Sequence, residues 1–222
     1  MKSCAQVVMI VGPVGSGKST ASAVAAKLLS ARGTSATAIS SGYIYRIFAY
    51  ISHVMGIDWE ANNSQDLLEE MKHSEIVITA EGGVTVDGDP IEVTYLKAEE
   101  ISVLTSKIAQ VPAVRQLAQA KLNEVISRFE GELVLVDGRD HEASLYGDNP
   151  VLMLIYLQVS DTEASRRTGE SVEEVIARNE RDAERLRAAE LKANTILDTT
   201  MVSEDRVAER IAAHVTLMLN PR

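Results

Sequence analysis

Short apolar runs and amphipathic segments alternate along most of the chain. Runs rich in Val, Ile and Leu occur at 7–11, 36–39, 133–136, 151–159 and 195–197. Segments with helical periodicity lie between most of them, at 18–32, 43–55, 66–72, 98–110, 113–129, 160–167, 171–191 and 203–219. Continuous apolar strands separated by helices are typical of a parallel sheet covered on both faces. The pattern predicts a three-layer α/β protein with a five-stranded parallel sheet.

Two short segments depart from this alternation. Residues 76–93 contain brief alternating runs broken by Gly82-Gly83 and Asp87-Gly88, which predict antiparallel strands joined by tight turns. We expect an acceptor-side insertion at 57–97 that projects over the carboxyl edge of the sheet, where ligands bind in open α/β folds. The second segment, 160–171, carries Arg166 and Arg167 and suits a mobile lid over phosphates, although a solvated loop has the same composition.

The first apolar run leads directly into the sequence GPVGSGKST, from Gly12 to Thr20. This is a complete P-loop, in which glycines let consecutive N–H groups turn toward a phosphate and the next helix offers its positive end. Lys18 adds charge at the outer phosphates, and Ser19 supplies a hydroxyl ligand for Mg²⁺. The residues expected to bind the donor nucleotide are Gly12, Gly15, Ser16, Gly17, Lys18, Ser19 and Thr20, with Arg166 from the lid.

The apolar run at 133–136 is followed by Asp137, Gly138, Arg139 and Asp140. In a P-loop fold, a carboxylate at the end of the strand beside the loop holds a Mg²⁺-bound water, and Asp137 is expected to do so. Arg139 suits forked contacts to a phosphate. The alternative is a strand-end turn in which Asp137 and Arg139 pair with each other.

A third cluster lies in the helix-like segment 171–191. Arg178, Asp182 and Arg185 recur at spacings of four and three, so they share one face of a continuous helix. A surface helix carrying ion pairs has the same pattern. The residues alone therefore leave open whether this face belongs to a functional site or is only an ion-paired surface.

Composition limits the classes of partner and compartment. The 222 residues are 45% hydrophobic, which suits a single domain over 1–222 with one large core. The formal net charge is −10, so no broad positive field favours nucleic acid or anionic lipid. One cysteine excludes an internal disulfide and suits a reducing, cytoplasmic location. We expect a monomer without membrane spans whose partners are small nucleotides.

Several separate motifs, in order, resemble the bacterial cytidylate kinases. These nucleoside monophosphate kinases transfer the γ-phosphoryl group of ATP to CMP or dCMP. Besides the P-loop, the resemblance rests on SGYIYR at 41–46, VDGD at 86–89, SKIA at 106–109, VPAVR at 111–115, DGRD at 137–140, the segment 178–185, and LDTT at 197–200. It extends from the P-loop almost to the end of the chain.

The resemblance implies a role for each matching position. On the acceptor side it implies Tyr45 and Arg46, with Arg46 on the CMP phosphate, and Ser40 stands where the family has a carboxylate. It implies that Ser106, Arg115 and Asp140 read the cytosine edge. Arg139 and Arg178 correspond to phosphate or sugar contacts, Asp182 to the sugar hydroxyls, and Arg185 to the base and phosphate. With ATP and Mg²⁺ bound, the catalytic set is Lys18, Arg139, Arg178 and Asp137.

Three departures from the family pattern keep other functions open. Ser40 replaces the family's Asp, His141-Glu142 follows DGRD where the family has Ile or Met and then Gly, and the lid is shorter. One alternative is a P-loop kinase of the same fold that acts on a different or modified nucleotide or another small acceptor. A second is a nucleotide-binding regulatory module with little turnover. The guanine signature Asn-Lys-x-Asp is missing from the sequence, which disfavours a GTPase.

Overall fold

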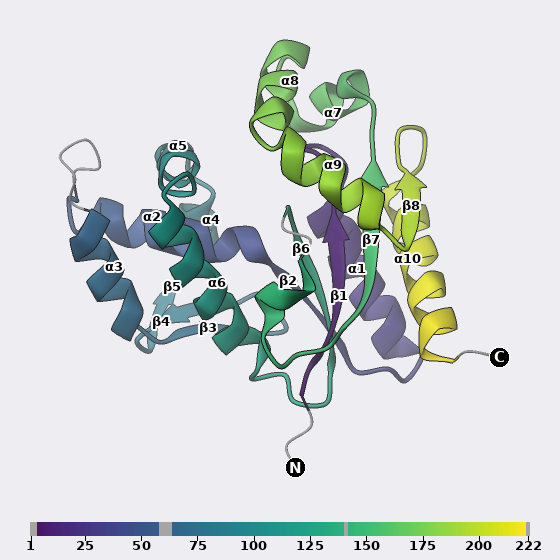
Figure 1. Cartoon of the computed structure of the whole chain (residues 1–222), viewed down its shortest axis with the longest axis horizontal. Coiled ribbons are helices and arrows are strands. Elements are labelled where there is room, and N and C mark those ends of the chain that lie inside the picture. Colours follow the sequence, from purple (N-terminus) through teal and green to yellow (C-terminus); the bar gives the residue numbers. More distant parts are fainter. Residues whose placement is uncertain (1–3, 58–63, 140–141, 221–222) are drawn as a thin grey trace. The chain divides into compact units, whose positions relative to one another are not determined.

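The structure is a computed structural model that describes residues 4–57, 64–139 and 142–220 (Figure 1). It divides into two compact units, Met1–Ile39 with Phe129–Arg222, and Ser40–Arg128. No helix in the described ranges is long and apolar enough to cross a membrane.

The first unit is built around a five-stranded sheet. Its strands are β1 (Gln6–Val11), β2 (Ala36–Ser40), β6 (Leu133–Gly138), β7 (Val151–Gln158) and β8 (Thr195–Asp198), in the order β2-β6-β1-β7-β8. β1 lies in the centre and pairs in parallel with β6 and β7, and β7 pairs in parallel with β8. All five apolar runs therefore form the predicted strands. Parallel pairing also places the ends of β1 and β6, each followed by functional residues, at the same edge.

Helices cover both faces of this sheet. α1 (Lys18–Ala31) and α10 (Glu204–Leu219) pack together on one face, where Val8, Ile10 and Ile155 belong to a continuous apolar core. The alternate strand residues, such as Val7 and Met9, are buried too. α9 (Ala183–Lys192) contacts β7, in front of the strands in Figure 1. The layered α/β fold predicted from the sequence is confirmed.

The single helix predicted over 171–191 is wrong. The chain forms α8 (Val172–Arg181) and α9, separated at Asp182, whose φ of −110° and ψ of 6° leave the helical region. A capping box at Ser171 and Glu174 starts α8 where the sequence indicates. The break lies at Asp182, whose side chain binds an arginine outside the helix, as described below.

The second unit contains the predicted antiparallel strands. β3 (Ile76–Ile78), β4 (Val84–Val86) and β5 (Asp89–Ile91) form a three-stranded sheet in that order. Asp87 and Gly88 both have positive φ, as the two-residue turn between β4 and β5 requires.

Helices make up the rest of the second unit. They are α2 (Ser41–Val54), α3 (Ser64–His73), α4 (Val93–Leu96), α5 (Glu99–Ile108) and α6 (Pro112–Ile126). α2 packs on α5, and α3 packs on α6. Phe48, Met71 and Ile108 are fully buried in this unit. The expected insertion at 57–97 thus belongs to a larger compact unit, and its role over the acceptor stays a prediction.

Candidate active site

The P-loop connects β1 to α1, as the sequence indicates. A Cβ on Gly12 would lie 2.3 Å from the carbonyl oxygen of Leu157 in β7. Gly15 has a φ of 71°, and a Cβ there would lie 2.7 Å from the Cα of Ala164. Both positions therefore require glycine, because the loop runs directly against neighbouring backbone.

Lys18 at the start of α1 points back into the loop. Its Nζ donates hydrogen bonds to the Gly12 carbonyl at 2.8 Å, the Pro13 carbonyl at 2.6 Å and the Ser16 Oγ at 3.3 Å. The pKa of Lys18 is lowered to about 7, chiefly by burial; the nearby charges of Arg139 and Arg178 contribute to this lowering, and Asp137 opposes it. These charges identify Lys18, Arg139, Arg178 and Asp137 as one electrostatic cluster within the first unit.

This low pKa predicts that nucleotide binding takes up a proton. An anionic phosphate beside Lys18 restores the charged amine, so at pH 8 we expect uptake of about 0.9 proton per nucleotide, and much less at pH 6. Affinity should accordingly fall as the pH rises above about 7. Calorimetry of ADP binding in buffers of different ionisation enthalpy measures the uptake, and Lys18→Met should abolish it. Equal uptake in that variant would assign the proton to another group.

The same shift makes the stability of the free protein depend on pH. The unfolded chain keeps the Lys18 proton up to its ordinary pKa of 10.5, whereas the folded chain loses it near 7. The unfolded state thus binds more protons between these values. This group therefore makes the folded state more stable as the pH rises through that interval.

Ser19 and Asp137 lie together at the carboxyl edge of the sheet. The Ser19 hydroxyl donates to Asp137 Oδ1 at 2.8 Å, and Asp137 is buried at the end of β6. A hydroxyl and a carboxylate are hard oxygen donors that suit Mg²⁺ when phosphate oxygens and water complete the shell. Among the described residues, no cluster of three His, Cys, Asp or Glu side chains could hold a metal. The donor set fits an ion brought with a phosphate.

Asp182 joins two of the expected phosphate residues. Its carboxylate accepts from Arg139 Nη1, 43 residues away at the end of β6, and from Arg185 Nη2 on α9. The Asp182 side chain is only 14% exposed, so this is not an isolated surface pair. The structure brings Arg139, Asp182 and Arg185 together. Asp140 lies outside the described residues.

Arg178 on α8 has a partner that sequence reasoning missed. Its Nη1 binds Oε1 of Glu170, in the turn between α7 (Asp161–Thr168) and α8. The other carboxylate oxygen of Glu170 is buried and accepts no hydrogen bond in the structure. Arg178 nevertheless lies close enough to Lys18 to lower its pKa. Arg178 therefore forms an ion pair, and its role toward phosphate stays a prediction.

The lid arginines lie in the last turn of α7 and differ in exposure. Glu163 Oε1 accepts from Arg166 Nη2 at 2.7 Å and from Arg167 Nε at 2.8 Å, and these bonds lower the pKa of Glu163 to about 2. Arg166 is 71% exposed, whereas Arg167 is 16% exposed and reaches the Gly15 carbonyl at 3.3 Å and the Thr199 hydroxyl at 3.1 Å. Arg167 therefore ties α7 to the P-loop, a role that its sequence position did not reveal.

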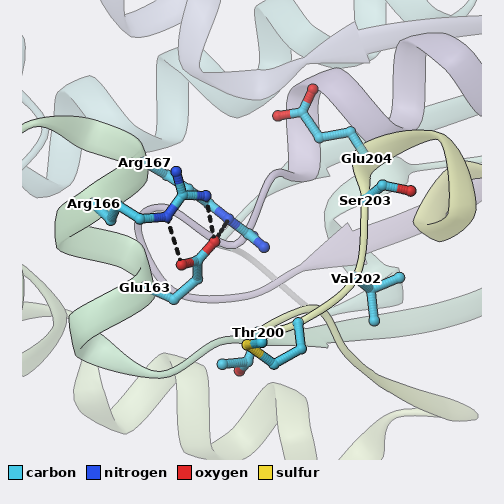
Figure 2. Close-up of a pocket in the computed structure, with 8 residues that line it drawn as sticks. Glu163, Arg166, Arg167, Thr200, Val202, Ser203 and Glu204 are labelled. Atoms are coloured by element: carbon cyan, nitrogen blue, oxygen red, sulfur yellow. Dashed lines mark hydrogen bonds and ion pairs between the residues drawn. The ribbon is translucent and has the colours of Figure 1, made fainter.

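A hollow of about 480 Å³ opens beside this lid (Figure 2). One side carries the Glu163–Arg166–Arg167 cluster, and the other is the segment that leads into α10. Its lining residues are Glu163, Arg166, Arg167, Thr200, Met201, Val202, Ser203 and Glu204. Arg166, expected to contact the donor nucleotide, borders this hollow.

Five of the residues expected to contact the acceptor lie in the second unit. Tyr45 and Arg46 lie on α2, Ser106 on α5 and Arg115 on α6, and Ser40 ends β2. Arg46 Nη1 donates to the Leu96 carbonyl at 2.6 Å and to the Ser102 Oγ at 3.0 Å.

The Ser106 hydroxyl bonds within its own helix, to the Ser102 carbonyl at 3.2 Å. Arg46 thus joins α2 to the end of α4 and to α5, whereas the Ser106 bond stays within α5. The roles of these residues toward an acceptor stay predictions.

Two further contacts to the P-loop were not foreseen. Val14 N donates to Asn179 Oδ1 at 3.0 Å, and the hydroxyl of the buried Thr199 donates to the Ser16 carbonyl at 3.3 Å. Both residues stand in motifs that the sequence singles out, but an Asn or Thr side chain carries no signal for a distant backbone partner.

The parallel sheet, the loop between β1 and α1, and the arginines around that loop define a P-loop kinase fold. A crystal structure of TT1252 from Thermus thermophilus has the same fold, with a TM-score of 0.50 over 98% of this chain and 99% of that chain at 21% identity. The cytidylate kinase family model matches residues 8–217. This chain belongs to the cytidylate kinase family.

Relatives align over nearly the whole length. The cytidylate kinase of Pseudomonas fluorescens strain Pf0-1 is 30% identical, and that of Pseudomonas entomophila strain L48 is 31% identical. Each alignment covers 98% of both chains. The family inferred from the motifs is thus confirmed.

Proposed function

We propose that this protein transfers the γ-phosphoryl group of ATP to CMP or dCMP, giving ADP and the cytidine diphosphate. The observation that carries the proposal is the cluster of Lys18, Asp137, Arg139 and Arg178 at the P-loop of a cytidylate kinase family member. The family implies ATP as the donor and small nucleotides as substrates. The relatives named cytidylate kinase support the choice of acceptor.

The donor is bound by the first unit. Its phosphates lie in the P-loop, where Lys18 leaves the Gly12 and Pro13 carbonyls to contact them. The adenine ring occupies the hollow beside Arg166, whose exposed guanidinium suits stacking on a planar base. Ser19 and Asp137 would hold Mg²⁺, Asp137 through water, and the ion would supply positive charge to offset that of the phosphate oxygens.

Transfer needs positioning and charge more than a covalent nucleophile. An oxygen of the CMP phosphate attacks the γ-phosphorus as the bond to the β–γ bridging oxygen breaks, and ADP leaves. Lys18, Arg139 and Arg178 offset the negative charge that spreads over the migrating group. Asp182 keeps Arg139 in place through its ion pair. In the substrate complex, Arg178 exchanges Glu170 for phosphate.

Label transfer tests this proposal directly. The protein, ATP labelled at the γ-phosphate, Mg²⁺ and CMP are incubated, and nucleotides are separated by chromatography. We expect label in CDP. Label that appears only in inorganic phosphate, or only when another acceptor replaces CMP, would contradict the proposal and favour a different acceptor or a regulatory module.

Arg115 is proposed to read the cytosine base from the first turn of α6. Arg115→Ala should lower kcat/KM for CMP by about 10- to 100-fold. The weaker activities with UMP and AMP should stay within about threefold, because a lost hydrogen-bond donor affects only the base that accepts from it. Arg210→Ala, which removes an exposed arginine of α10, is the matched control. Equal losses for all three acceptors would show that Arg115 does not read the base.

A further inference from the structure

Asn179 makes a long-range contact to the outer side of the P-loop. Its Oδ1 accepts a hydrogen bond from Val14 N at 3.0 Å, although the residues are 165 positions apart. The bond is partly buried. It is directional, and it fixes the orientation of one peptide unit within the loop.

Apolar contacts support the loop at the same place. Val14, Ala164 of α7 and Val175 of α8 form a small buried cluster. The Cα of Ala164 also lies within 2.7 Å of the position that a Cβ on Gly15 would occupy. Helices α7 and α8 therefore hold the outer side of the loop by packing, and Asn179 adds the polar bond that fixes its orientation.

This external support gains importance when a nucleotide binds. In the free protein, Lys18 ties the loop internally through the Gly12 and Pro13 carbonyls. According to the proposed function, Lys18 leaves them to contact phosphate, so the loop loses these two bonds. The Asn179 bond joins the Val14 amide to α8 and does not involve Lys18, so it can persist when Lys18 moves. It can therefore keep the loop amides aimed inward.

We propose that Asn179 is a positioning residue for the phosphate-binding loop, and this inference rests on the donor binding proposed above. It acts through the Val14 peptide and touches neither nucleotide. Misplacement of the loop amides by a fraction of an ångström weakens phosphate binding.

Paired substitutions separate the hydrogen bond from the volume of the side chain. Asn179→Leu keeps the size and removes the acceptor, whereas Asn179→Asp keeps an acceptor oxygen. Glu173→Gln, at an exposed position of the same helix, is the control. The dissociation constant of Mg²⁺ with a non-hydrolysable ATP analogue is measured by calorimetry without any acceptor. Melting curves verify that each variant is folded.

We expect Asn179→Leu to raise this dissociation constant about 10-fold and the KM for ATP in parallel, with kcat at saturating ATP within about threefold. Asn179→Asp keeps an acceptor but adds a negative charge beside the phosphate site, so its loss should shrink as the salt concentration is raised, whereas the loss in Asn179→Leu should not; the control should stay within about twofold. Binding by Asn179→Leu within twofold of native, or losses in the Leu and Asp variants that stay equal at high salt, would overturn the inference. If the native protein binds the analogue but does not phosphorylate CMP, the proposed acceptor is contradicted. The dissociation constants of the variants, compared with that of the native protein, would still decide the role of Asn179.

Discussion

Lys18→Met should lower kcat for phosphoryl transfer by about 10³-fold or more and leave the fold intact. Lys18 carries the positive charge nearest the loop carbonyls, and it is the P-loop group expected to contact the migrating phosphoryl group. Removing one preorganised group of this kind costs about 10²- to 10³-fold, and here the charge itself is lost. Steady-state kinetics with ATP and CMP measure the effect.

The melting temperature of Lys18→Met should stay within about 3 °C of native, because its apolar side chain is buried without the penalty that lowers the pKa of the amine. Lys27→Met, on an exposed position of the same helix, controls for the loss of a lysine. Substantial turnover by Lys18→Met would show that the P-loop is not the site of phosphoryl transfer. A large fall in its melting temperature would instead indicate a structural lysine.

Asp182→Ala should impair both activity and stability. Its carboxylate holds Arg139 and Arg185, and its removal leaves two partly buried guanidinium groups facing each other. We expect a loss of about 100-fold in kcat/KM and about 2 kcal/mol in unfolding free energy, or roughly 4–8 °C in melting temperature. Kinetics and thermal melting measure the two effects.

Asp182→Asn should lose less stability than Asp182→Ala, because an amide oxygen still accepts one hydrogen bond. Glu180→Ala, an exposed residue two positions earlier, should change neither quantity appreciably. If the losses in Asp182→Ala and Arg139→Ala add fully in the double variant, the two residues do not act as a pair. A native free energy of unfolding in Asp182→Ala would likewise show that the ion pairs of Asp182 with Arg139 and Arg185 do not stabilise the fold.

The sequence predicts the main sheet and the loop well for a physical reason. Strands buried on both faces are continuously apolar, as in Val7–Val11, and they cannot be mistaken for surface segments. The P-loop combines glycines with a lysine at fixed offsets, because backbone approach and charge both limit the residues allowed. Local patterns with such strict requirements can be read without a structure.

Contacts that depend on distant partners could not be predicted in this way. Helical periodicity continues through Asp182, but the helix breaks there, at a residue whose side chain binds Arg139, which directly follows β6. The roles of Glu170 and Asn179 likewise depend on their partners in the folded chain: Glu170 pairs with Arg178, and Asn179 accepts from Val14 N. No local pattern records which backbone amide or guanidinium a polar side chain will meet in the folded chain.

The most direct test of the central claim is a coupled ADP-release assay with ATP, Mg²⁺ and a panel of CMP, dCMP, UMP, dTMP, AMP, GMP and no acceptor. A cytidylate kinase should give a much higher kcat/KM with CMP or dCMP than with the other nucleotides, and little ADP without acceptor. ADP release that does not depend on CMP or dCMP, from protein that binds ATP normally, would contradict the proposed function.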